Sequence, residues 1–269
     1  LRPSGADWRK YGAILLGFFT LTRLVLIALS DLKFEEAYYW DYSQHPSLSY
    51  FDHPPCVAWM IGFSTWLLGN TAFAVRLPGV LAFLGSGILL RRLSDQQFGA
   101  RAGFWTVLLL NSLPALDVHA LVILPDNPLL FFWSLGLYAG WQLIASGDTR
   151  WWWVVGVATG LGMDAKYPAL LIPAGIFLHC FLSGKRKIAL NLPMLGSALL
   201  ALGLFSPVIA WNVRNGMASF KFQGAERMHE AISVSERLGS WLFQLGLLTP
   251  PAFVALGAAL VWAWRHRED

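Results

Sequence analysis

Long apolar runs with almost no charged residues recur through most of this chain, and they restrict its fold more than any other feature. A helix needs about 20 residues to cross a hydrocarbon core of about 30 Å, and its backbone polar groups must be satisfied within the helix. The sequence therefore predicts an all-α polytopic membrane protein. We expect spanning helices at Tyr11–Leu29, Thr71–Leu90, Ala102–Leu116, Pro128–Ala145, Trp151–Met163, Pro168–Leu182, Leu190–Trp211 and Trp241–Trp264.

The composition agrees with a membrane protein. Of 269 residues, 56 % are apolar and 13 % are charged, which is too few charges to cover a soluble domain of this length. The net charge of +4 does not indicate a nucleic-acid partner, because Lys and Arg stand mostly in short clusters between apolar runs. We expect the first run to be a retained helix rather than a signal peptide. Cys56 and Cys180 are expected near opposite faces, as unpaired packing residues.

The distribution of positive charge predicts the orientation. Lys and Arg gather in alternate connections, while the Leu116–Asn127 connection has none, so the basic connections are expected in the cytosol. The basic residues are Arg2, Arg9, Lys10, Arg91, Arg92, Arg101, Arg150, Lys185, Arg186, Lys187, Arg265 and Arg267. The outer segment 212–239 departs from this pattern, since it carries Arg214, Lys221, Arg227 and Arg237. Positive charge on the outer side needs another explanation.

The first outer connection, Ser30–Asn70, is long and rich in aromatic and acidic residues. Aromatic side chains with one polar end favour the membrane interface, so we expect short helices lying along the outer surface there. No internal repeat or separate soluble domain is visible. The sequence therefore predicts one transmembrane domain over residues 1–269, with residues 30–70 as an outer loop that carries candidate catalytic acids.

Two of these acids, Glu35 and Glu36, directly follow the first expected span. Adjacent helical residues point about 100° apart, so at most one of the two carboxylates should face a given cavity. The other is expected to be structural. The alternative is a solvated helix start, in which both acids favour the N-terminal end of the helix dipole.

Asp52 and His53 precede two prolines in the same loop. The prolines hold them in an extended backbone, which suits side chains that are presented to a ligand. Asp and His can ligate a divalent cation or orient a phosphate, so this pair is the candidate metal site. The alternative is an interfacial turn capped by Asp52.

Two further candidates stand at the outer ends of later spans. Asp126 lies before a proline in Leu-Pro-Asp-Asn-Pro, so its plain role is to cap the following helix, although it could share a cavity with Glu35 or Glu36. Lys166 lies in a tight outer connection, where a lysine either extends toward water or meets an anion. Lys221 and Arg227 add cations to the same face, as an anionic lipid headgroup would require.

Taken together, these segments resemble a known family. Glu35-Glu-Ala-Tyr-Tyr-Trp40, Tyr50-Phe-Asp-His-Pro-Pro55, Leu124-Pro-Asp-Asn-Pro128, Ala165-Lys-Tyr167 and Pro207-Val-Ile-Ala-Trp-Asn212 are similar to segments of the polyprenyl-phosphate-sugar glycosyltransferases with the GT-C fold. The bacterial branch with protein O-mannosyltransferase-like enzymes and the lipid A aminoarabinose transferase is the most similar. Family members usually carry Asp where Glu35 stands, and they continue well past this length, so the resemblance implies that this chain is truncated at its C-terminus.

The resemblance implies an inverting transfer of a sugar from a polyprenyl-phosphate (undecaprenyl-phosphate) donor, on the outer face of a bacterial inner membrane. The acceptor would be lipid A, another glycan or a protein. Glu35, or failing that Glu36, would take the acceptor's proton, while Lys166, His53, Arg227 and Lys221 would bind the donor phosphate, with or without a divalent cation at Asp52 and His53. Tyr38, Tyr39, Asp126 and Tyr167 would support the site.

Two other functions stay open. A polyprenyl-lipid transporter or flippase would place ionisable groups near the bilayer midplane, often in repeated halves. Here they concentrate at one face, and Arg23 is the residue expected inside a span. A catalytically inactive lipid-binding relative is the other alternative, because Glu35 is one methylene longer than the family's usual Asp.

Overall fold

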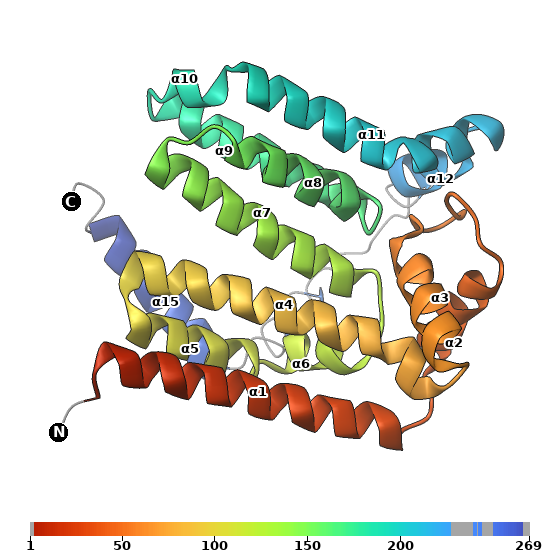
Figure 1. The fold of residues 1–269 in the computed structure, drawn as a ribbon, viewed down its shortest axis with the longest axis horizontal. Helices are drawn as coiled ribbons and strands as arrows, with labels where there is room; N and C mark the ends of the chain where they lie inside the picture. The colour runs from red at the N-terminus through yellow and green to blue at the C-terminus, as the bar shows by residue number, and fades with distance from the viewer. Residues whose placement is uncertain (1–2, 227–238, 241, 244–249, 266–269) are drawn as a thin grey trace.

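The computed structural model describes residues 3–226, 239–240, 242–243 and 250–265, and every regular element in these ranges is helical (Figure 1). The fold is therefore all-α, as the apolar runs predict. The elements are α1 (Gly5–Leu29), α2 (Phe34–Gln44), α3 (Cys56–Leu68), α4 (Ala72–Phe98), α5 (Ala100–Leu110), α6 (Pro114–Leu121), α7 (Asp126–Ser146), α8 (Trp151–Met163), η1 (Tyr167–Leu170), α9 (Leu171–Leu182), α10 (Arg186–Ala189), α11 (Leu192–Arg214), α12 (Ala218–Lys221), the π-helical turn η2 (Phe222–Glu226) and α15 (Pro250–Arg265).

Four helical stretches in the described ranges are long and apolar enough to cross a membrane. They are Gly5–Leu29, Ala72–Phe98, Asp126–Ser146 and Arg186–Arg214. Shorter apolar helices accompany them, among them α3, α5 and α9. The chain is therefore a multi-pass membrane protein, and the long helices set its thickness.

The helices run side by side, with one group of connections at each end (Figure 1). Helices α1, α4 and α5 pack together, α8 packs between α7 and α11, and the contact of α4 with α7 joins the two groups. The N-terminus, the α4–α5 connection and α10 lie at one end, where Arg91 donates to the backbone oxygen of Arg9 and Lys185 to that of Ile144. At the opposite end, which we call the outer end, lie α2, α3 and α12.

Residues 30–70 form short helices, as predicted, but several expected spans have other limits. The third expected span breaks after Leu110, because the side chain of Asn111 accepts a hydrogen bond from Arg23 at 2.5 Å and Pro114 starts the separate helix α6. The second continues to Phe98, and the sixth begins with the 3₁₀ turn η1. Of the eighth, part lies outside the described residues.

Glycines let α8 and α11 approach closely. A Cβ atom on Gly156 would lie 2.6 Å from the backbone oxygen of Ser197, and one on Gly160 would lie 2.9 Å from that of Ala201. Small residues four apart on facing helices are a common way to pack helices in lipid, where dispersion contacts replace the hydrophobic effect. This spacing fixes α11 against α8, and with it one wall of a large cavity described below.

Candidate functional site

Glu36 is fully buried at the start of α2. Its carboxylate accepts hydrogen bonds from Arg76 Nε and Nη2, at 2.6 and 2.5 Å, and from the backbone N–H groups of Lys33 and Ile123, at 2.8 and 3.1 Å. Arg76 also donates to backbone oxygens of the α1–α2 connection. These bonds satisfy both buried charges and tie α2 to α4 and to the segment before α7.

Glu35 occupies the exposed side of α2 instead, so the two acids diverge as adjacent helical residues should. Within the described ranges it makes no hydrogen bond or ion pair. Tyr38 and Tyr42 follow it at three and seven residues, which puts the three side chains on one stripe of the helix. That stripe carries the two phenols that bind Asp52.

Asp52 accepts hydrogen bonds from the hydroxyl groups of Tyr38 at 3.0 Å and Tyr42 at 2.6 Å. Burial, together with the neighbouring carboxylate, raises the pKa of Tyr42, so this phenol stays protonated and keeps donating. The imidazole Nε2 of His53 lies 4.0 Å from Asp52 Oδ2. The Tyr39 ring, buried on the inner side of α2, contacts the His53 ring with centroids 5.7 Å apart. Asp52 and His53 thus form one polar cluster with the tyrosines of α2.

Lys166 meets an anion rather than extending freely into water. Its ammonium lies 2.8 and 2.9 Å from the two carboxylate oxygens of Asp126, the first residue of α7. The expected capping role of Asp126 is wrong, because Pro125 occupies the cap and Asn127 supplies the nearby side-chain bond, accepting from the backbone N–H of Leu124 at 2.6 Å. Both partners of the Lys166–Asp126 pair are about one-third exposed, so a ligand can reach them.

Hydrogen bonds to backbone oxygens bring the Lys166 connection and η2 beside the Asp52 loop. The N–H of Cys56, at the start of α3, donates to the backbone oxygen of Asp164 at 2.9 Å. Gln223 of η2 donates its side-chain amide to the backbone oxygen of Asp52. The result is a cavity of about 200 Å³ at the outer end, lined by His53, Pro54, Lys166, Tyr167, Pro168 and Gln223. We call it the polar cavity.

Asp164 is 1 % exposed, and neither carboxylate oxygen finds a hydrogen-bond partner in the described part of the chain. Burial raises the pKa of Asp164 to about 7. A buried carboxyl with a raised pKa therefore lies two positions before Lys166, which lines the polar cavity.

Three expected ligand-binding roles stay predictions. In the described ranges no group of three or more His, Cys, Asp and Glu side chains lies close enough to hold a metal ion, so Asp52 and His53 stand as a pair. Lys221 is exposed at the end of α12. Arg227 lies outside the described residues.

Arg76 is a site residue that the sequence analysis did not select. An arginine inside an apolar span, here between Thr71 and Leu90, is costly unless it is paired, and that cost could have pointed to it. Its partner could not have been chosen, because 40 residues separate Arg76 from Glu36. Arg23, the expected intramembrane arginine, is 3 % exposed and is bound to Asn111 and Asp117.

Residues 52–211, more than half of the chain, match the family described as dolichyl-phosphate-mannose-protein mannosyltransferase. The match contains Asp52, His53, Asp126, Lys166 and Tyr167. Glu35 and Glu36 precede it.

Three named relatives also align. The lipid A galacturonosyltransferase RgtD of Rhizobium johnstonii is 28 % identical over 97 % of this chain and 56 % of its own length. The lipopolysaccharide core galacturonosyltransferase RgtA of the same organism is 27 % identical over 96 % and 52 %. The undecaprenyl phosphate-α-4-amino-4-deoxy-L-arabinose arabinosyl transferase 1 of Sodalis glossinidius is 29 % identical over 47 % and 24 %. The chain thus spans about half the length of the first two. No solved structure matches it.

Proposed function

The chain belongs to the dolichyl-phosphate-mannose-protein mannosyltransferase family, and from that premise we propose that it is an inverting glycosyltransferase. It moves a sugar from a polyprenyl-phosphate donor to an acceptor at the outer end of the helix bundle. The relatives act, by their names, on lipid A and on lipopolysaccharide core, which favours a glycolipid acceptor over a protein. The name of the third relative favours undecaprenyl phosphate as the donor carrier.

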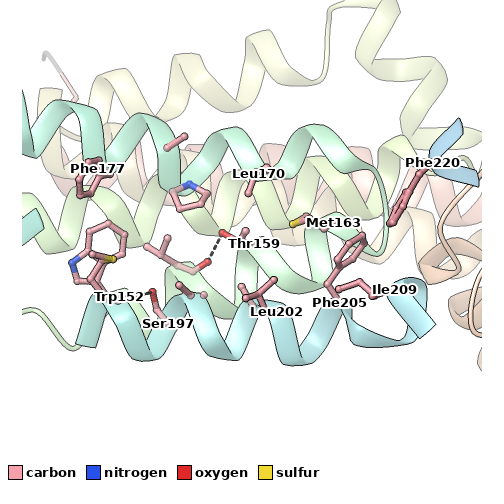
Figure 2. A pocket seen from close by; sticks show the side chains of 17 residues that line it. Trp152, Thr159, Met163, Leu170, Phe177, Ser197, Leu202, Phe205, Ile209 and Phe220 are labelled. Atoms are coloured by element: carbon pink, nitrogen blue, oxygen red, sulfur yellow. Dashed lines mark hydrogen bonds between the residues drawn. The ribbon is translucent and has the colours of Figure 1, made fainter. Parts of the chain in front are cut away.

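The observation that carries this proposal is a polar cavity that adjoins a long apolar one. Helices α8, α9 and α11 enclose a second cavity of about 680 Å³, lined by Trp152, Thr159, Met163, Leu170, Phe177, Ser197, Leu202, Phe205, Ile209 and others, with Phe220 at its outer end (Figure 2). We call it the apolar cavity. Tyr167, which lines the polar cavity, contacts Phe205 and Phe220 of the apolar cavity, with ring centroids 5.9 and 5.5 Å apart. The two cavities therefore meet at one aromatic wall.

The apolar cavity suits a hydrocarbon chain. Its hydroxyl groups are already used, since Thr159 donates to the backbone oxygen of Val155 and Ser197 to that of Met194, both at 2.8 Å (Figure 2). No ligand hydrogen bond is needed there, and the space holds several isoprenoid units. A donor with its lipid tail in the apolar cavity would have its phosphate in the polar cavity, beside His53 and Lys166.

The chemistry follows from this placement. The acceptor oxygen attacks the anomeric carbon from the face opposite the phosphate, the bond between that carbon and the phosphate oxygen breaks, and the Glu35 carboxylate receives the acceptor's proton. Lys166 and His53 stabilise the charge that grows on the leaving phosphate. In the structure Lys166 is paired with Asp126, so a bound phosphate would share its ammonium. Tyr38 and Tyr42 hold the carboxylate of Asp52, the residue before His53.

A divalent cation at Asp52 and His53 would add positive charge beside the same phosphate. The proposed donor carries its sugar on the side of the bacterial inner membrane away from the cytosol. The outer end of the protein therefore has to face the periplasm. The basic connections at the other end support this orientation.

The test is transfer of radiolabel from a panel of undecaprenyl-phosphate sugars in membranes that contain the full-length protein. We expect label in a lipid-extractable acceptor. Donor movement between leaflets without label transfer would instead identify a flippase, and donor binding without either would identify an inactive relative.

Variants of Lys166 test the proposed binding of the donor phosphate in the same assay. Lys166→Ala should weaken donor binding and turnover while the protein stays in the membrane, and Lys166→Arg should rescue in part, because guanidinium is larger and planar. Unchanged donor affinity in Lys166→Ala would remove Lys166 from the phosphate site.

A further inference from the structure

Two further cavities are lined in part by α3, the helix that follows the Asp52–Pro55 loop. One is an outer cleft of about 640 Å³, lined by Pro46, Ser47, Leu48, Trp59, Trp211, Arg214 and Asn215. We call it the tryptophan cleft. Trp59 comes from α3 and Trp211 from the outer end of α11. The indole N–H of Trp59 donates to the backbone oxygen of Ser47 at 3.0 Å, which fixes this ring against the loop.

Two polar groups that line the tryptophan cleft are left for a ligand, the guanidinium of Arg214 and the amide oxygen of Asn215. Arg214 is exposed and, within the described ranges, makes no hydrogen bond or ion pair, so its planar set of N–H donors is free to bind a phosphate or carboxylate. The Asn215 amide nitrogen donates to the backbone oxygen of Trp211 at 2.8 Å, which leaves its carbonyl oxygen to accept from a hydroxyl group. Two indoles, a guanidinium and an amide oxygen are the kinds of group that recognise a sugar bearing an anion.

The tryptophan cleft shares Trp59 with a cavity of about 570 Å³ that is lined by apolar side chains of α3, α4, α7 and α8. Its walls include Met60, Phe63, Leu81, Phe131 and Leu161. A molecule with its headgroup in the cleft can therefore place acyl chains in the adjoining space. The occupant that fits both parts is an anionic glycolipid, because a free sugar phosphate would leave the apolar part empty.

The tryptophan cleft also lies close along the chain to the proposed donor phosphate site. His53 and Pro54 line the polar cavity, while Cys56 and Trp59 line the apolar space beside the cleft. A short stretch of chain thus joins the donor phosphate site to Trp59. From these contacts, and resting on the proposed glycosyl transfer, we infer that the tryptophan cleft binds the anionic saccharide headgroup of the glycolipid acceptor. This role also accounts for Arg214, a positive charge at the outer end that the orientation pattern leaves unexplained.

Binding can be measured without catalysis. The full-length protein in phosphatidylcholine nanodiscs would be titrated with bisphosphorylated lipid A, with dephosphorylated lipid A and with phosphatidylglycerol. Arg214→Gln should weaken binding of the phosphorylated form about tenfold and leave the dephosphorylated form unchanged, since one charged contact is worth about one factor of ten. Trp211→Ala should weaken both forms. Arg92→Gln, an exposed arginine of α4 at the opposite end, is the matched control and should change neither.

Transfer assays separate this inference from the proposed function. In Arg214→Gln the acceptor KM should rise while donor affinity stays normal. Wild-type affinity in both cleft variants, or displacement of lipid A by an equal concentration of phosphatidylglycerol, overturns the inference. If the lipid A affinities change as expected but the wild-type protein transfers no sugar, the tryptophan cleft still binds the glycolipid headgroup and the glycosyltransferase proposal fails.

Discussion

Five acidic side chains at the outer end have very different surroundings. Glu36 is held by four donors, Asp52 by two phenols and Asp126 by an ammonium, whereas Asp164 is buried without a partner among the described residues. Glu35 is the exposed member of the set. A general base needs access to its substrate and a free lone pair, and of these five carboxylates Glu35 combines both.

The pair Glu35 and Glu36 gives a prediction with its own control. Glu35→Gln keeps the size of the side chain but cannot take a proton, so turnover should fall roughly 10²-fold or more while donor binding and thermal stability stay near normal. Radiolabel transfer and thermal unfolding in detergent measure the two effects.

Glu36→Gln should behave in the opposite way. It leaves Arg76 buried without a full counter-charge, and breaking a buried pair costs about 3–5 kcal/mol, so the melting temperature should fall. Full transfer activity in Glu35→Gln, with normal stability but no activity in Glu36→Gln, would move the base to Glu36. Full activity in both variants would rule out a carboxylate base in this loop.

Asp164 predicts a pH dependence of stability. Its pKa is raised by burial to about 7, above its unfolded value, so its contribution to stability is complete below about pH 4 and is lost as the pH rises through 7. Asp164→Asn cannot ionise. The melting temperature of the wild-type protein minus that of Asp164→Asn should therefore decrease between about pH 5 and pH 8. A difference that is constant over this range would show that Asp164 stays charged.

At this scale the sequence predicts residue types but not their partners. That only one of Glu35 and Glu36 faces outward follows from helical geometry. That Lys166 binds Asp126 does not, because the two are 40 residues apart and the contact depends on how α7 meets the α8–η1 connection. A capping role was expected for Asp126 because the residues next to it in the sequence suggest a helix cap and say nothing of a partner far along the chain.

Among the elements, the apolar runs predict most helices, and the errors have local causes. The predicted span Ala102–Leu116 has the right composition, but a polar residue, Asn111, is bound there by Arg23 from α1. Hydropathy does not report such a contact. The short helices of residues 30–70 were predicted correctly, because interfacial aromatics are a local signal.

The contact between α8 and α11 gives a prediction about packing. Gly156→Val would push side-chain carbons into the backbone of α11, so the melting temperature in detergent should drop by several degrees, and donor binding should weaken as the wall of the apolar cavity shifts. Gly175→Ala in α9 is the control, since a Cβ there has nothing within 4 Å. Equal stability of the two variants would mean that α8 and α11 separate at no cost.

For the whole molecule, the arrangement predicts opposite accessibility of its two ends. Ser47→Cys would place a thiol at the outer end and Ser183→Cys one at the end with the basic connections, while the native Cys56 and Cys180 are buried and give little background. An impermeant thiol reagent added to intact cells should label the Ser47→Cys variant alone, and inverted vesicles should reverse the result. Labelling of both variants from one side would contradict the arrangement of the helices.

The bonds of Glu36 also have a consequence for the order in which the protein is made. Its carboxylate takes donors from Arg76 and from the backbone of Ile123, which leave the ribosome about 40 and 87 residues later. During synthesis the loop that follows the first helix therefore holds an acid without its arginine until α4 has been made, and without its last donor until the chain has passed α6. Any quality-control step that acts on the nascent chain meets this loop before it has its final shape.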